Sequence, residues 1–254
     1  MAVRASARAW LSRALAVGLL AGLAACSGND ADSRSSPVDP QVLQDVISAT
    51  FMVPGADVRR AMRVLQFGRE QAIEKCGGEA GPIDGTANRY DQSRFPDLAL
   101  IRSRGFSEPE ATAAEDRRLE AIGGDCRDLA PPFPAYRRWF VLQSPWADVV
   151  TAAEQDERLT RLKAPMATCL DDATGLDVAA DDPVNSFLRA VNTELAHGSA
   201  GREKSLARAY ADCAAPYFDE LRTLLLARRP ALVERHRELI TTYAREISGA
   251  GYVP

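Results

Sequence analysis

Histidine is scarce in this chain, with two residues among 254, and the short motifs of histidine-, serine- and cysteine-based catalysis are missing. There is no HExxH, no GxSxG and no CxxC, which are typical of zinc peptidases, serine hydrolases and thioredoxin-like oxidoreductases. His197 precedes a glycine at a predicted helix end, where a cation interacts favourably with the helix dipole, and His236 lies among charged residues. The sequence therefore identifies no catalytic residue and no cofactor.

An excess of positive charge is also missing. The 31 Lys and Arg residues are outnumbered by 35 Asp and Glu residues, for a formal net charge of -4. Proteins that bind nucleic acids present a basic stripe or patch. Nucleic acid is therefore not an expected partner.

The first 25 residues have the order of a secretory signal. Arg4, Arg8 and Arg13 precede the apolar run LAVGLLAGL of residues 15–23, with no acid among them. Such signals combine a positive segment, an apolar run of roughly 7–15 residues and small residues at the cleavage site. A membrane-spanning helix needs about 20 apolar residues. We therefore interpret residues 1–25 as a signal peptide.

Small residues at 24 and 25 are followed directly by Cys26. The stretch LAAC resembles the lipobox of bacterial lipoprotein precursors, and the resemblance implies that Cys26 carries a diacylglyceryl group and becomes the first mature residue. Two acyl chains hold a protein stably at a membrane, at about 0.8 kcal/mol per buried methylene. The alternative is an ordinary secretory signal in which Cys26 is incidental.

A polar stretch, SGNDADSRSSPVDP, follows at residues 27–40. Segments rich in Ser, Asp, Gly and Pro cannot bury enough surface to order themselves. We expect residues 26–40 to be a lipidated, flexible tether and residues 41–254 to form the extracytoplasmic domain. Loss of the three signal arginines would change the net charge from -4 to -7.

The domain has abundant Ala and Arg and few β-branched residues, which favours helices. Capping residues and apolar spacing predict helices over 57–76, 107–126, 144–170, 183–195 and 202–247. Pro165 should kink or split the third, and Pro216 and Pro230 should divide the last into two or three. Residues 137–143 fit a short strand or a helical turn. The predicted fold is all-α, an irregular multi-helix bundle.

Four cysteines remain after Cys26 is assigned to lipid, and an even count in an exported protein indicates disulfides. Cys76 and Cys169 each end a helix before a nearby glycine, and Cys126 and Cys213 each follow an aspartate. These neighbourhoods indicate a duplicated helix pair, with halves at 41–135 and 136–254, or chance similarity of Ala-rich helices. We expect Cys76 to bond Cys126 and Cys169 to bond Cys213.

The cysteine neighbourhoods IEKCGGEAG, RRLEAIGGDC, MATCLDDATG and LARAYADC, with the lipobox and tether, resemble a loose group of exported lipoproteins from high-GC Gram-positive bacteria. The resemblance extends over most of the chain. It implies an extracytoplasmic location and a helical, disulfide-linked body, and it implies no activity.

Three aromatic residues near a proline cluster form a candidate ligand surface. Trp139, Phe140 and Trp146 lie close to prolines 131, 132 and 134. Aromatic side chains beside prolines can line a pocket for a ligand or peptide. Burial in the core is the alternative.

An acidic loop is a weak candidate for a calcium site. Its carboxylates are Asp171, Asp172, Asp177 and Asp181. Calcium prefers such oxygen ligands, but the spacing does not match an EF-hand, and a solvated acidic loop is the alternative. Asp182, before Pro183, should instead cap the next helix.

The favoured interpretation is a lipid-anchored protein on the extracytoplasmic face of the cell membrane that binds an envelope protein or a cell-wall component. An exposed apolar or aromatic patch would support it. The alternative is a cell-envelope enzyme whose two carboxylates face each other across a cleft at roughly 5–10 Å. The sequence favours binding without deciding between them.

Overall fold

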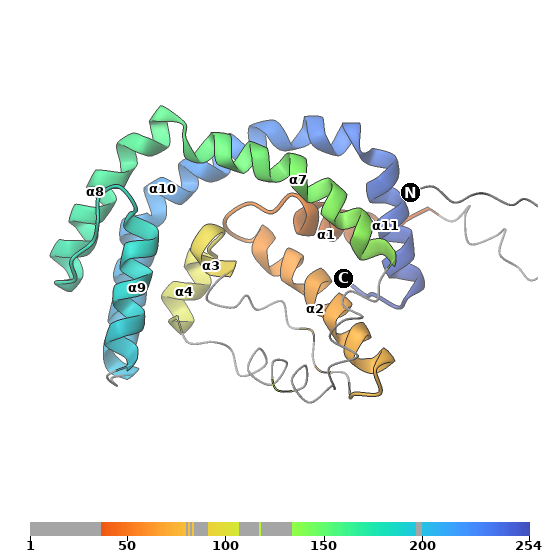
Figure 1. The fold of residues 1–254 in the computed structure, drawn as a ribbon, viewed down its shortest axis with the longest axis horizontal. Helices are drawn as coiled ribbons and strands as arrows, with labels where there is room; N and C mark the ends of the chain where they lie inside the picture. The colour runs from red at the N-terminus through yellow and green to blue at the C-terminus, as the bar shows by residue number, and fades with distance from the viewer. Residues whose placement is uncertain are drawn as a thin grey trace, which may run out of the picture. The chain divides into compact units, whose positions relative to one another are not determined.

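The computed structural model describes residues 37–79, 81, 83, 91–106, 117, 134–196 and 200–254. Residues from Val38 to Pro254 belong to one compact unit. All regular secondary structure in the described part of the chain is helical (Figure 1), which confirms the predicted all-α class. None of the described helices is both long and apolar enough to cross a membrane.

The first two helices, α1 (Pro40–Thr50) and α2 (Asp57–Lys75), pack against each other. The Asp39 carboxylate caps α1 by accepting a hydrogen bond from the Gln41 amide at 2.7 Å. Helix α2 ends where Gly77 takes a φ of +78°, a conformation that glycine adopts without a steric penalty. The predicted helix over 57–76 and its glycine stop are therefore confirmed.

Two short helices follow, α3 (Asp91–Arg94) and α4 (Leu98–Arg104), and α4 packs against the long helix α10 (Ala200–Arg235). Asp97 caps α4 by accepting from the Leu100 amide at 3.1 Å, and its other oxygen pairs with Arg59 Nε at 2.9 Å. Gly105 then takes a φ of +95°, and a Cβ there would lie 3.0 Å from the Glu203 carboxylate. The backbone conformation thus favours glycine, and a larger residue would also require the Glu203 side chain to shift.

Helices α7 (Pro134–Glu154), α8 (Glu157–Thr174) and α9 (Pro183–Ala196) follow. The expected helix start at Ser144 is wrong, because Pro145 lies inside α7, and residues 137–143 are helical. Pro165 was expected to kink or split the helix, and the split is not found. Helix α8 continues through it, and the break falls earlier, where the Asp156 carboxylate caps α8.

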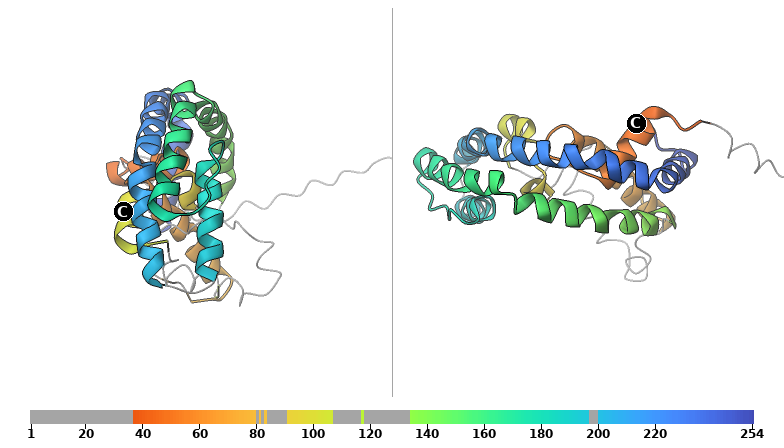
Figure 2. Two further views of the ribbon diagram at one scale, coloured as in Figure 1. Left: turned by 90° about the vertical axis from the view of Figure 1, so that its left-hand side faces the viewer. Right: turned by 90° about the horizontal axis from the view of Figure 1, so that it is seen from above.

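The C-terminal third consists of α10 (Ala200–Arg235) and α11 (Arg237–Gly249). Helix α10 continues through both Pro216 and Pro230, and the break comes at His236. Two helices form this third, within the two or three expected, but the expected breaks at Pro216 and Pro230 are wrong. Helix α10 contacts α4, α7, α8, α9 and α11, and Figures 1 and 2 show α7 running alongside it.

One connected core includes residues from both predicted halves of the domain, from Val42 to Tyr252. Tyr210, which is fully buried, lies among aromatic rings in this core. It stacks on Phe187 at a centroid distance of 5.4 Å and packs against Phe106 at 5.5 Å. Burial raises the pKa of Tyr210, so its phenol stays neutral at ordinary pH.

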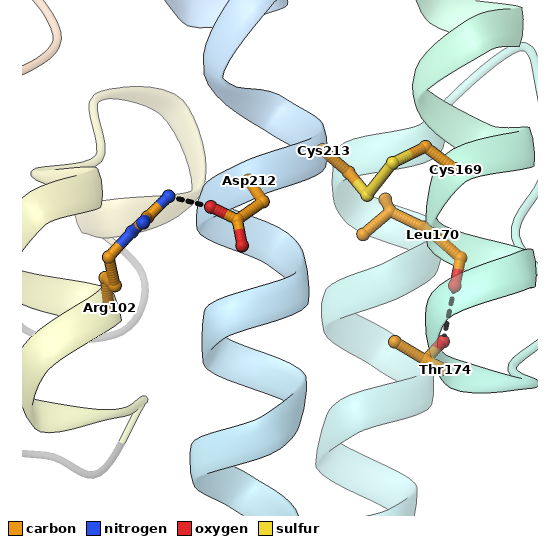
Figure 3. The surroundings of a disulfide bond; sticks show 6 residues. All are labelled: Arg102, Cys169, Leu170, Thr174, Asp212 and Cys213. Carbon is orange, nitrogen blue, oxygen red and sulfur yellow. Dashed lines mark hydrogen bonds and ion pairs between the residues drawn. A yellow bond between two sulfur atoms is a disulfide. The ribbon is translucent and has the colours of Figure 1, made fainter.

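A disulfide between Cys169 and Cys213 joins α8 to α10, with a Cα–Cα distance of 5.6 Å (Figure 3). This predicted pair is confirmed. Asp212 points to the other side of α10, where it pairs with Arg102 of α4. Cys76 is also disulfide-bonded, but Cys126 lies outside the described residues, so its pairing with Cys76 stays a prediction, as does the helix over 107–126.

Candidate functional site

A cleft of about 340 Å³ lies among α3, the end of α7, α8, the start of α9 and the middle of α10. Four charged residues, Arg94, Glu154, Lys163 and Asp182, line it together with an apolar floor, and we call it the charged cleft. Its volume is at the lower end of the range of small-molecule sites, about 300–1,000 Å³. It is therefore large enough for a small ligand.

The floor of the charged cleft comes mainly from one face of α10. Tyr217, Phe218 and Leu221 lie there, and Val184 at the start of α9 adds to them. The Tyr217 and Phe218 rings are 5.2 Å apart and perpendicular, a favourable edge-to-face arrangement. All four side chains are buried, so the floor is a fixed part of the core.

Glu154 and Arg94 form a bidentate ion pair in the charged cleft. Arg94 Nε lies 2.9 Å from Glu154 Oε1, and Arg94 Nη2 lies 3.2 Å from Glu154 Oε2. The pair joins α3 to the last turn of α7 and neutralises the Glu154 carboxylate. Because both side chains are partly exposed, the pair contributes little to stability and mainly fixes the position of two charges.

Asp182 lies directly before α9, as the capping prediction required. Its carbonyl oxygen accepts the Ser186 amide at 3.0 Å, and its Oδ1 accepts from the Asn185 side chain at 2.9 Å. Its half-buried carboxylate forms no ion pair within the described ranges. The negative charge of Asp182 is thus held in place without a cation beside it.

Lys163 of α8 also lines the charged cleft and is half-buried. Within the part of the chain that the structure describes, its ammonium group forms no hydrogen bond and no ion pair. An ammonium group carries three donors. The cleft therefore contains one cation and one carboxylate that are not paired with each other.

The pKa of Tyr217 responds to this arrangement. Burial, followed by the negative charges of Glu154 and Asp182, raises the pKa of Tyr217 to about 12, while Arg94 opposes the shift. An unfolded tyrosine has a pKa of about 10. The hydroxyl is therefore neutral at physiological pH and keeps its proton.

We expect alkaline pH to destabilise the protein partly through Tyr217. A group whose pKa is raised by folding contributes its full stability below the unfolded pKa and loses it as the pH rises through the folded pKa. The free energy of unfolding should therefore fall between about pH 10 and pH 12. Urea unfolding across this range should show a smaller fall for Tyr217→Phe. Equal falls in the variant and the wild type would contradict the assignment.

The predicted aromatic ligand surface is not found at Trp146. This side chain is 4% exposed, its indole N–H donates to the Met52 carbonyl at 3.1 Å, and it packs edge-on against Phe51. Trp146 is therefore a core residue of α7 that packs against the chain just after α1, at Phe51 and Met52. The side chains of Trp139 and Phe140, and all of Cys26, lie outside the part that the structure describes.

The acidic loop after α8 has a structural explanation. Asp171 Oδ1 accepts a hydrogen bond from the Val178 amide at 2.8 Å and so closes the turn. Asp172, Asp177 and Asp181 are exposed. No group of three His, Cys, Asp or Glu residues among the described ones is placed to hold a metal ion.

Comparison of the chain with protein-family models, with curated proteins and with solved structures found no match. The function of this all-α protein therefore has to be argued from its own residues. Sequence reasoning did not find the charged cleft, because Arg94, Glu154 and Lys163 all resemble ordinary solvated helix positions. Only Asp182 carried a signal, as the residue expected to cap α9.

Proposed function

We propose that the protein is a lipid-anchored binding module on the extracytoplasmic face of the cell membrane, with the charged cleft as its ligand site. The observation that carries the binding part is Lys163, which pairs with none of the described residues and lines a preformed cleft with a buried apolar floor. Ligand sites combine such apolar surface with a few fixed polar groups. The cleft meets both conditions without rearrangement.

The location is supported by two independent features. The first is the signal-like segment ending in LAAC at Cys26. The second is the disulfide between Cys169 and Cys213, because such bonds persist in oxidising, extracytoplasmic compartments and are rare where thiols are kept reduced. Cys169 is exposed, so cytosolic reductants would reach the bond easily. Both features favour an exported protein.

The charges of the cleft favour binding over catalysis. A general acid must be able to gain and lose a proton, but Arg94 holds both oxygens of Glu154. The other carboxylate, Asp182, already accepts from Asn185. Fixed charges of this kind suit recognition of a complementary ligand.

A cell-envelope enzyme is the second candidate, because one observation favours it. Glu154 and Asp182 line the same cleft, and both act on the Tyr217 hydroxyl. If they are catalytic, Asp182→Asn should abolish turnover of a bound molecule while leaving its binding largely intact. A binding module would instead lose affinity and release its ligand unchanged.

The anchor is tested by replacing Cys26 with serine in the cell that produces the protein. We expect the wild type in the membrane fraction, with a mature N-terminal peptide whose mass includes two or three acyl chains, and the Cys26→Ser variant without that mass. Cys169→Ser is the matched control, since it should keep the lipid. An unmodified Cys26 peptide from the wild type would contradict the anchor.

The ligand site is tested by placing a photoreactive amino acid at Ser93, which lines the charged cleft. The same substitution at Ser248, an exposed position on α11, is the control. On illumination in the producing cells, we expect a new adduct mass at residue 93 and none at residue 248. The adduct should be lost in Lys163→Met. Adducts at both positions, or at neither, would contradict a ligand in the cleft.

A further inference from the structure

We infer that the charged cleft binds a small zwitterion of the amino-acid or short-peptide class, with its carboxylate on Lys163 and its ammonium group on Asp182. This inference rests on the proposed ligand site and names the chemistry of its ligand. The charged residues that line this one cavity indicate such a ligand.

The four charges of the cleft divide into one ion pair and two groups that form no ion pair with the described residues. Arg94 and Glu154 neutralise each other through two hydrogen bonds. Lys163 and Asp182 line the same cavity but form no ion pair, so their charged atoms lie more than 4.0 Å apart. A ligand that carries one negative and one positive group fits between them.

The cost of partial desolvation supports this assignment. Half-burying a charge without a partner is unfavourable, and the chain could relieve it by bringing Lys163 and Asp182 together. The two groups are instead held on different helices, α8 and the start of α9. Such separation leaves both charges available to a ligand, in the way that binding sites are preorganised.

The signs of the charges exclude simpler ligands. The lining carries two cationic and two anionic side chains, so its formal charge is zero. A phosphate or another multiply charged anion would gain from Lys163 but would be repelled by Asp182, since Arg94 and Glu154 offset each other. A simple cation would be attracted by Asp182 but repelled by Lys163. A ligand with both charges has favourable contacts at each end.

The floor of the cleft indicates which kind of side chain the zwitterion carries. Val184, Phe218 and Leu221 are buried apolar residues, and the neutral Tyr217 hydroxyl offers one donor. An apolar side chain on the zwitterion would therefore rest on this floor. We expect a preference for an apolar residue, such as leucine, over a charged one.

The full-length chain is expressed and processed in the cell that produces it, and the resulting protein is purified in detergent. Alanyl-leucine is the probe. Binding is measured by calorimetry for the free dipeptide, its N-acetyl form and its C-terminal amide. Each blocked form should bind at least tenfold more weakly, because it lacks one charge. Lys163→Met should remove the difference between the free dipeptide and the amide, and Asp182→Asn the difference between the free and N-acetyl forms.

Lys204→Met is the matched control, since Lys204 is exposed on α10 and forms no ion pair with the described residues. It should leave all three affinities unchanged. Equal binding of free and blocked dipeptides, no effect of Lys163→Met, or no heat at millimolar dipeptide would overturn the zwitterion. If an adduct at Ser93 that depends on Lys163 is still found, the ligand site stands and only its ligand class is wrong.

Discussion

Replacing Cys169 and Cys213 together with alanine should lower the free energy of unfolding by about 4 kcal/mol. The two cysteines are separated by 44 residues along the chain, and a crosslink across a loop of that length removes about this much conformational entropy from the unfolded state. The bond joins α8 to α10 at one of the main helix contacts of the molecule. Its loss should therefore leave the fold intact but less stable.

Urea unfolding under non-reducing conditions, followed by far-ultraviolet circular dichroism, measures this effect. Ser205→Ala is a suitable control, since Ser205 is exposed on α10 and makes only a local hydrogen bond to Arg202; it should unfold like the wild type. Equal midpoints for the double cysteine variant and the wild type would contradict the prediction.

The same variant should also weaken ligand binding if the charged cleft is the site. Lys163 lies on α8 and Tyr217 on α10, so the disulfide holds together two walls of the cleft. Tyr217 follows Cys213 by one helical turn. Losing the crosslink permits these walls to move relative to each other, and a less preorganised site binds more weakly.

Local sequence signals predicted the end of α2 and the start of α9 correctly, but they misplaced the start of α7 and the effect of the prolines. Asp182 lies at the start of α9 and Gly77 stops α2, because capping and positive φ depend on neighbouring residues alone. Pro165 and Pro216 were expected to break helices and do not. A proline inside a helix removes one hydrogen bond, and buried neighbours such as Leu170 keep the helix in place.

The disulfide was predictable and the charged cleft was not, for a physical reason. Cys169 and Cys213 are chemically distinctive, and few pairings exist for four cysteines. Arg94 and Glu154, in contrast, are among many charged residues on helix surfaces, and tertiary packing alone places them together across 60 residues of chain. The position of Trp146 also depends on tertiary packing. Its place near a proline cluster predicted a ligand surface, whereas packing buries it in the core.

The second large effect is expected at Asp45, which is 1% exposed on α1. Its Oδ2 accepts from the Tyr252 hydroxyl at 2.7 Å and from Arg63 Nη2 at 3.3 Å. These bonds join the C-terminal segment to α1 and α2. Removing one partner of a buried charged pair costs about 3–5 kcal/mol. Arg63 is partly exposed, so we expect Asp45→Ala to lower the free energy of unfolding by about 3 kcal/mol.

Two further variants separate the charge from the packing. Tyr252→Phe keeps the edge-to-face contact with Phe67, at 5.3 Å, and removes only the hydroxyl, so it should cost about 2 kcal/mol, as loss of a hydrogen bond to a charged group does. Asp177→Ala removes an exposed carboxylate and should cost nothing measurable. Urea unfolding at neutral pH compares all three. Asp45→Ala leaves the Tyr252 hydroxyl and the Arg63 side chain without their shared acceptor. If this variant nevertheless unfolds like Asp177→Ala, the buried cluster does not hold the C-terminal segment.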